Sequence, residues 1–92
     1  MDCFWRGMLH IFQNHGKLQR YMTTAYMDPK AGTVRIRKLK EESKPWSPSE
    51  KFMLALALHL YNPSNKVDLA GMDSLDSNNV RIALEAIRIR YS

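Results

Sequence analysis

Apolar residues recur at helical spacing in four stretches of the chain. The first stretch has aromatic and aliphatic side chains three or four residues apart, namely Phe4, Met8, Ile11 and Phe12. Asp2 can cap a helix at its start, and His15-Gly16 is typical of a helix end. We predict a helix over about residues 2–14, and its apolar face must be covered by the rest of the domain or by another chain.

A second helix is predicted over residues 17–27. Its apolar residues have the spacing that places side chains on one helix face, and they are Leu18, Tyr21, Met22, Ala25 and Tyr26. Asp28-Pro29 ends this helix, because a proline disfavours the α conformation of the residue before it.

The next segment alternates apolar and basic residues, in the sequence TVRIRKLK at residues 33–40. Such alternation is typical of a strand, but Leu39 breaks it, and a strand here would have to pair with residues assigned to the second helix. We interpret residues 33–42 as an extended or short helical connection that docks Val34, Ile36 and Leu39 on the core. The sequence leaves open whether residues 33–40 form a strand or a helix.

The clearest element begins at residues 47–50, SPSE, a capping box with proline at the first helical position. Residues 52–61, FMLALALHLY, are apolar on almost every side, which is typical of a buried helix. Asn62-Pro63 ends the run. We therefore predict a central helix over residues 48–61.

A last helix is predicted over about residues 77–90, capped within residues 76–79, after a loop with a helical turn around residues 67–69. Its predicted core stripe comprises Val80, Ala83, Leu84, Ile87 and Tyr91. The fold class is therefore mainly α. We expect a single domain over residues 1–92, a bundle of about four helices with a basic irregular or short β connection at residues 29–46.

Composition limits where the protein acts. A single cysteine, Cys3, excludes an internal disulfide framework and fits a reducing compartment. No run of about 18 apolar residues is present, so no segment is expected to span a membrane. The N-terminal residues lack the features of a signal peptide. We expect a cytoplasmic protein.

Charge is distributed unevenly along the chain, which has a net charge of +5. Residues 1–44 contain nine lysines and arginines and four acidic residues, whereas residues 45–92 contain five of each kind. Six cations fall within fifteen residues, and they are Lys30, Arg35, Arg37, Lys38, Lys40 and Lys44. This asymmetry points to an acidic partner.

Catalytic and metal-binding patterns are weak. His10 and His15 are five residues apart, and neither this spacing nor Cys3 matches a zinc motif. The four glycines stand apart, so no phosphate-binding loop is indicated, and Cys3 lies too near the terminus for precise positioning as a nucleophile. We predict no metal, no cofactor and no enzymatic activity.

Binding of another macromolecule is the remaining class of function. The candidate partner-binding residues are Arg35, Arg37, Lys38, Lys40, Lys44 and Trp5. Trp5 is the better tryptophan for an exposed contact, including one between two copies of the chain, because Trp46 is expected to pack at the start of the central helix. Nucleic acid is an alternative ligand for the same cations, although Glu41 and Glu42 interrupt the run.

Several stretches resemble a family of small, uncharacterised bacterial and phage proteins. The similar residues are 49–51 (SEK), 56–62 (LALHLYN), 73–79 (DSLDSNN) and 83–91 (ALEAIRIRY), with a weaker match from 9–12 (LHIF) to 25–28 (AYMD). Family members have an additional N-terminal helix, so its absence here would leave the face of Phe4, Trp5 and Met8 available for a partner. The resemblance implies a helical fold and assigns no functional residue.

The phage-like resemblance suggests a role against a bacterial host. One example is an anti-CRISPR protein that binds and inhibits a Cas effector in the host cytoplasm, and the basic residues would then contact an acidic patch on the target. The positive charge argues against mimicry of DNA, which needs an array of carboxylates.

Overall fold

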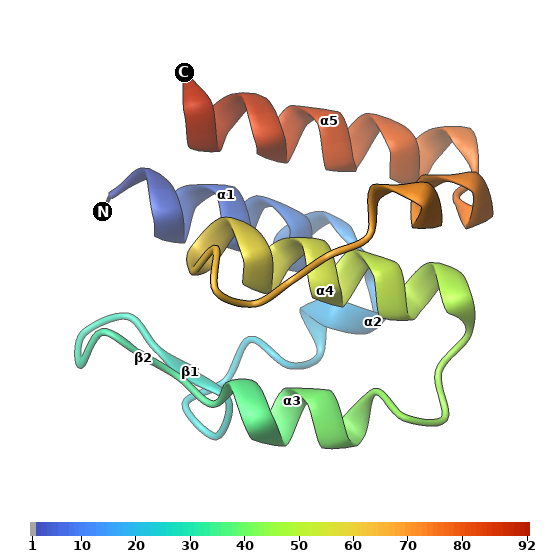
Figure 1. The fold of residues 1–92 in the computed structure, drawn as a ribbon. Helices are drawn as coiled ribbons and strands as arrows, with labels where there is room; N and C mark the ends of the chain where they lie inside the picture. The colour runs from blue at the N-terminus through green and yellow to red at the C-terminus, as the bar shows by residue number, and fades with distance from the viewer. Residues whose placement is uncertain (1) are drawn as a thin grey trace.

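The computed structural model describes residues 2–92. These residues fold into five α-helices, one 3₁₀ helix and one short hairpin (Figure 1). The elements in chain order are α1 (Cys3–Asn14), α2 (Gly16–Gln19), β1 (Met27–Asp28), β2 (Thr33–Val34), α3 (Ile36–Glu42), α4 (Pro48–Tyr61), η1 (Leu69–Ser74) and α5 (Ser77–Tyr91). The predicted fold class is confirmed, because the domain is mainly helical with one short β connection. Among the helices of residues 2–92, none combines the length and apolar character needed to cross a bilayer.

The long helices α1, α4 and α5 pack against one another, while α3 and the hairpin lie on the side away from α5 (Figure 1). Helix α4 is buried on most sides, as predicted, through Phe52, Met53, Leu54, Leu56, Ala57, Leu58 and Leu60. Helix α1 begins where the sequence indicates, since the Asp2 carboxylate accepts a hydrogen bond from the Trp5 backbone N–H at 2.9 Å.

Helices α1 and α5 approach each other closely at Gly7. A Cβ atom on Gly7 would lie 3.0 Å from Arg90 Cβ and 3.3 Å from the Ala86 carbonyl oxygen. Ala83 and Ala86 are also completely buried, so small residues on α5 contribute to this close packing. The glycine that weakens α1 as an isolated helix therefore serves its packing.

The capping box at the start of α4 forms as predicted. The Glu50 backbone N–H donates to Ser47 Oγ, and the Ser47 backbone N–H donates to the Glu50 carboxylate at 3.0 Å. The same carboxylate accepts from Lys17 Nζ at 3.2 Å, which ties α2 to α4. The backbone hydrogen bond from Ser47 lowers the pKa of Glu50, against the opposing effect of partial burial, and Lys17 lowers it further.

Replacing Ser47 with alanine is expected to lower the free energy of unfolding by about 1 kcal/mol, because an orphan N–H of α4 loses its acceptor. Urea denaturation monitored by circular dichroism measures this loss. Ser49→Ala is the matched control, since Ser49 lies outside the capping box and should change stability by less than about 0.5 kcal/mol. Equal losses in the two variants would contradict the capping role.

The predicted helix over residues 17–27 is wrong beyond Gln19. Instead, Met27 pairs with Val34 in an antiparallel hairpin. Asp28 Oδ1 accepts from the backbone N–H groups of Lys30 and Ala31 at 3.1 and 3.3 Å, and Gly32 adopts a positive φ of 71°. Turn chemistry and tertiary packing thus override the helical spacing. The structure also answers whether residues 33–40 form a strand or a helix: Thr33–Val34 is a strand, and α3 begins at Ile36.

Helix α5 exists as predicted, and its buried face was predicted in part, since Ala83 is buried and Ile87 packs against the core. The fully buried residues are Ile82, Ala83 and Ala86, whereas Leu84 is 55% exposed and Tyr91 is 61% exposed. The close approach of α1 at Gly7 accounts for part of the difference, because it places Ala86 in the contact, while Ile82 is buried and Leu84 is not. Leu84 and Tyr91 therefore remain exposed on α5.

Candidate functional site

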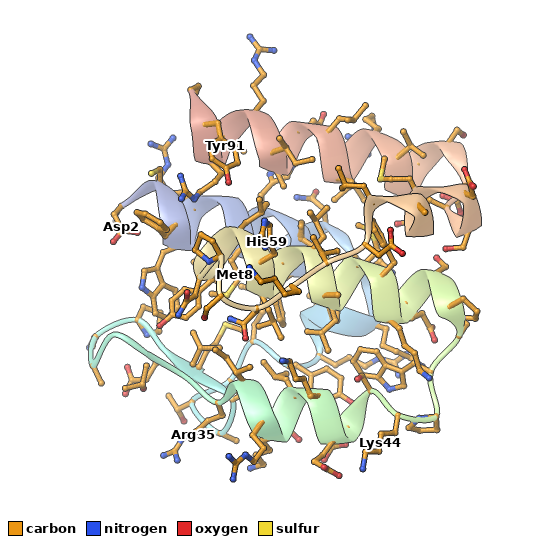
Figure 2. All side chains as sticks on the ribbon, in the orientation of Figure 1. Asp2, Met8, Arg35, Lys44, His59 and Tyr91 are labelled. Atoms are coloured by element: carbon orange, nitrogen blue, oxygen red, sulfur yellow. The ribbon has the colours of Figure 1, made fainter. Side chains whose placement is uncertain are left out.

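The cationic surface comprises six exposed basic residues of the hairpin, α3 and the residues flanking α3, namely Lys30, Arg35, Arg37, Lys38, Lys40 and Lys44. Figure 2 shows Arg35 and Lys44 near opposite ends of α3. Leu39, which is fully buried, anchors α3 to the core, with Val34 and Ile36 half-buried beside it. The predicted arrangement, apolar residues inward and basic residues outward, is confirmed.

Two cations of this surface have partners within the chain. Lys38 Nζ lies 4.7 Å from the centre of the Tyr26 ring, in a cation–π contact, and Lys44 Nζ lies 3.1 Å from Glu41 Oε2. Arg35, Arg37 and Lys40 form no ion pair among residues 2–92. The surface therefore keeps cations that are available to another molecule.

One carboxylate of α3 contacts Tyr26. The Tyr26 hydroxyl donates to Glu42 Oε1 at 3.4 Å, and desolvation together with the negative charge of Glu42 raises the pKa of Tyr26. Glu41 and Glu42 are both exposed beside the cations. The surface consequently has mixed charge with a cationic excess.

The prediction that Trp5 is an exposed contact residue is wrong. Trp5 is 8% exposed and packs edge-to-face on Tyr61, with ring centroids 5.3 Å apart. The neighbouring Phe4 is the exposed aromatic residue of α1, at 38%, and the Arg90 guanidinium covers its ring at 3.8 Å from the centroid. Helix α1 turns Trp5 toward Tyr61 of α4, and what remains exposed of Trp5 lines a hollow with Pro29 and Lys30.

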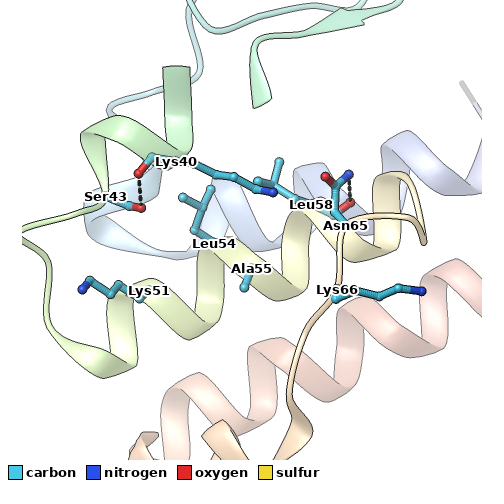
Figure 3. A pocket seen from close by; sticks show the side chains of 8 residues that line it. All are labelled: Lys40, Ser43, Lys51, Leu54, Ala55, Leu58, Asn65 and Lys66. Atoms are coloured by element: carbon cyan, nitrogen blue, oxygen red, sulfur yellow. Dashed lines mark hydrogen bonds between the residues drawn. The ribbon is translucent and has the colours of Figure 1, made fainter. Parts of the chain in front are cut away.

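A hollow of about 80 Å³ lies where α3, α4 and the segment after α4 meet (Figure 3). Its lining residues are Lys40, Ser43, Lys51, Leu54, Ala55, Leu58, Asn65 and Lys66. Ser43 Oγ donates to the Lys40 carbonyl at 2.8 Å, and Asn65 Nδ2 donates to the Leu58 carbonyl at 3.4 Å. These hydrogen bonds fix the Ser43 and Asn65 side chains, which are the uncharged polar residues of the lining.

Three lysines surround this hollow, and no acidic residue lines it. The Lys40 side chain extends over the hollow toward Leu58, while Lys51 and Lys66 point outward at opposite ends (Figure 3). None of the three lysines forms an ion pair within the described residues. The hollow thus combines an apolar floor with a cationic rim.

Sequence reasoning missed Lys51 and Lys66 as members of this site, because it considered only the basic run at residues 30–44. One signal was present. Lys51, Ala55 and Leu58 are spaced four and three residues apart, so they share one face of α4, and the small Ala55 leaves room between the larger side chains.

The three histidines lie apart, and each has its own hydrogen bond. His10 Nε2 is 3.0 Å from Glu85 Oε1, His15 Nδ1 accepts from the Leu18 backbone N–H at 3.4 Å, and His59 Nδ1 is 2.8 Å from the Asn65 carbonyl. The hydrogen bond with His10 lowers the pKa of Glu85, and Arg81 lowers it further. Residues 2–92 contain no cluster of His, Cys, Asp or Glu side chains suited to a metal ion.

His15 should make the stability of the protein depend on pH. Burial lowers the pKa of His15 below its ordinary value of 6.5, against the opposing effects of Glu50 and Asp76 and with a contribution from Lys17. The unfolded chain therefore takes up the proton first, and the free energy of unfolding falls as the pH drops below about 6.5 toward the lowered pKa. Protonation of Nδ1 also removes the acceptor that caps α2.

Urea denaturation at about pH 7.5 and about pH 5.5 measures this effect. We expect His15→Asn to lose less stability between the two pH values than the natural protein, because asparagine caps a helix without titrating. An identical pH dependence in both proteins would show that His15 is not its source.

No protein-family model matches the chain, and comparisons with curated proteins and with solved structures found no similar protein. The resemblance to small bacterial and phage proteins stays a prediction.

Proposed function

We propose that this protein is a non-enzymatic binding protein that contacts an acidic protein partner through its cationic surface. The supporting observation is the concentration of exposed cations on and around α3, of which Arg35, Arg37 and Lys40 have neither an ion pair nor a cation–π contact among residues 2–92. Buried Leu39 holds this element on the core. Such a surface steers and orients an acidic partner.

A protein is favoured over nucleic acid by the composition of the surface. Glu41 and Glu42 are exposed on the same helix as the cations, and a protein surface can match such mixed charge, whereas a phosphate backbone is uniformly negative. Arginine together with a half-buried tyrosine, Tyr26, is typical of protein interfaces. Nucleic acid binding by the same cations is the alternative.

The nature of the partner is proposed from the sequence resemblance alone. A phage or mobile-element protein of this kind would act in the bacterial cytoplasm on a host defence or effector protein, for example by inhibiting a Cas effector.

Capture from a nuclease-treated bacterial lysate tests the proposal. The natural protein should retain one stoichiometric protein partner, and Arg35→Glu/Arg37→Glu should lose it through charge repulsion. The matched control is Arg6→Glu/Arg88→Glu, which changes the net charge equally at exposed positions of α1 and α5 and should keep the partner.

Two results would contradict the proposal. Equal loss of the partner in both variants would show a general effect of charge. Loss of all capture after nuclease treatment, with nucleic acid bound to the untreated protein, would favour the nucleic-acid alternative, whose affinity should fall steeply with salt.

A further inference from the structure

We infer that the hollow between α3 and α4 receives one bulky apolar side chain from an acidic segment of the partner. The inference rests on the proposed function and adds the sequence character of the partner's contact segment, in which an apolar residue is flanked by aspartate or glutamate. Two independent features of the hollow support it, its floor and its rim.

The floor is apolar and small. Leu54 and Leu58 are almost fully buried, while Ala55 between them is half-buried and leaves the space open. The hollow of about 80 Å³ is far below the roughly 300–1,000 Å³ of pockets for small molecules and cofactors. It has room for a single side chain, which is how a central anchor residue occupies a protein interface.

The rim is cationic. Lys51 and Lys66 lie at opposite ends of the hollow, and Lys40 crosses it (Figure 3). All three are exposed and none has an ion pair among residues 2–92, so each is available to a carboxylate. Acidic residues on both sides of the anchor would therefore meet a lysine at each end.

The floor separates this inference from simple binding of polyanions. Phosphate contacts require the lysines but not Leu54, Ala55 and Leu58, which a nucleic acid backbone would leave uncovered. An acidic segment with an apolar anchor uses both features, so its affinity should depend on the shape of the hollow as well as on charge.

Two fluorescent peptides provide the probes. Both are short runs of aspartate and glutamate, one with a central leucine and one with a central serine, and fluorescence anisotropy measures their affinity. The natural protein should bind the leucine peptide at least about tenfold more tightly than the serine peptide. Equal affinities would overturn the inference.

Ala55→Lys is the decisive variant, because it fills the hollow with an aliphatic chain and also adds a positive charge. It should abolish the preference for leucine while binding the serine peptide at least as tightly as before. A preserved leucine preference would overturn the inference. Lysine is a good helix former, so α4 should persist, and thermal unfolding verifies this.

Lys51→Ala/Lys66→Ala tests the rim at two exposed positions where folding is not at risk. This double variant should bind both peptides about tenfold or more weakly, whereas the control Arg6→Ala/Arg88→Ala should bind them as the natural protein does. Equal weakening by the two double variants would overturn the role of the rim.

The lysate experiment distinguishes this inference from the proposed function. If Ala55→Lys retains the captured partner while Arg35→Glu/Arg37→Glu loses it, the cationic surface binds the partner and the hollow does not. If the natural protein captures no protein at all, the proposed function itself fails.

Discussion

Replacing Phe12 with alanine is expected to lower the free energy of unfolding by about 3–5 kcal/mol. Phe12 is 0% exposed, and it lies on α1, the helix that packs against both α4 and α5. Truncation removes apolar contacts and leaves a cavity that tightly packed helices cannot fill by relaxing. Each kcal/mol corresponds to roughly 4–8 °C in a domain of this size, so the melting temperature should fall by more than about 12 °C.

Differential scanning calorimetry of Phe12→Ala and Phe4→Ala provides the comparison. Phe4 is on the same helix but is 38% exposed, so the same chemical change should cost much less there, about 1 kcal/mol for the lost stacking on Arg90. Similar melting temperatures for the two variants would mean that α1 is not packed as described.

The second large effect is expected at Ile82, where alanine should lower the free energy of unfolding by about 2–4 kcal/mol. Ile82 is 1% exposed on the inner side of α5, whereas Leu84, two residues along, is 55% exposed. Leu84→Ala should therefore change stability by less than about 0.5 kcal/mol.

Urea denaturation of this pair determines which face of α5 is buried. The sequence-based stripe, which includes Leu84 and omits Ile82, predicts the opposite order of stability. A greater loss of stability in Leu84→Ala than in Ile82→Ala would support that sequence-based stripe and contradict the packing of α5 on α1.

Elements with local signals were predictable from the sequence. Helix α4 begins at a capping box whose bonding atoms lie within four consecutive residues, and its apolar run needs no knowledge of a partner. Asp2 at the start of α1 and Asp76 at the start of α5 are local in the same sense. These hydrogen bonds join residues three positions apart, so they can be predicted from the local sequence.

Elements that depend on distant residues were not predictable. The face that α5 buries depends on the approach of Gly7 from α1, and the hairpin at Met27 replaces a helix that the local spacing favours. Trp5 is buried because Tyr61, at the far end of α4, lies against its ring. For α5 and Trp5 the deciding contact joins residues far apart in the sequence. The hairpin pairs Met27 with Val34, and there the turn at Asp28 and Gly32 prevails over the helical spacing.

The candidate site follows the same division. The exposed cations on and around α3 were found because they lie close together in the sequence, with Ile36 and Leu39 between them turned toward the core. The hollow was not found, because Lys40, Ala55 and Lys66 come from three separate segments and only the fold brings them together.

The contact between α1 and α5 also affects how the protein folds as it is synthesised. His10 on α1 and Glu85 on α5 bond to each other across 75 residues. Translation at about 5–20 residues per second takes roughly 4–15 s to cover that interval, and during this time α1 has no α5 to cover it. The nascent chain consequently exposes the apolar side of α1 that α5 covers in the folded protein until α5 has been synthesised.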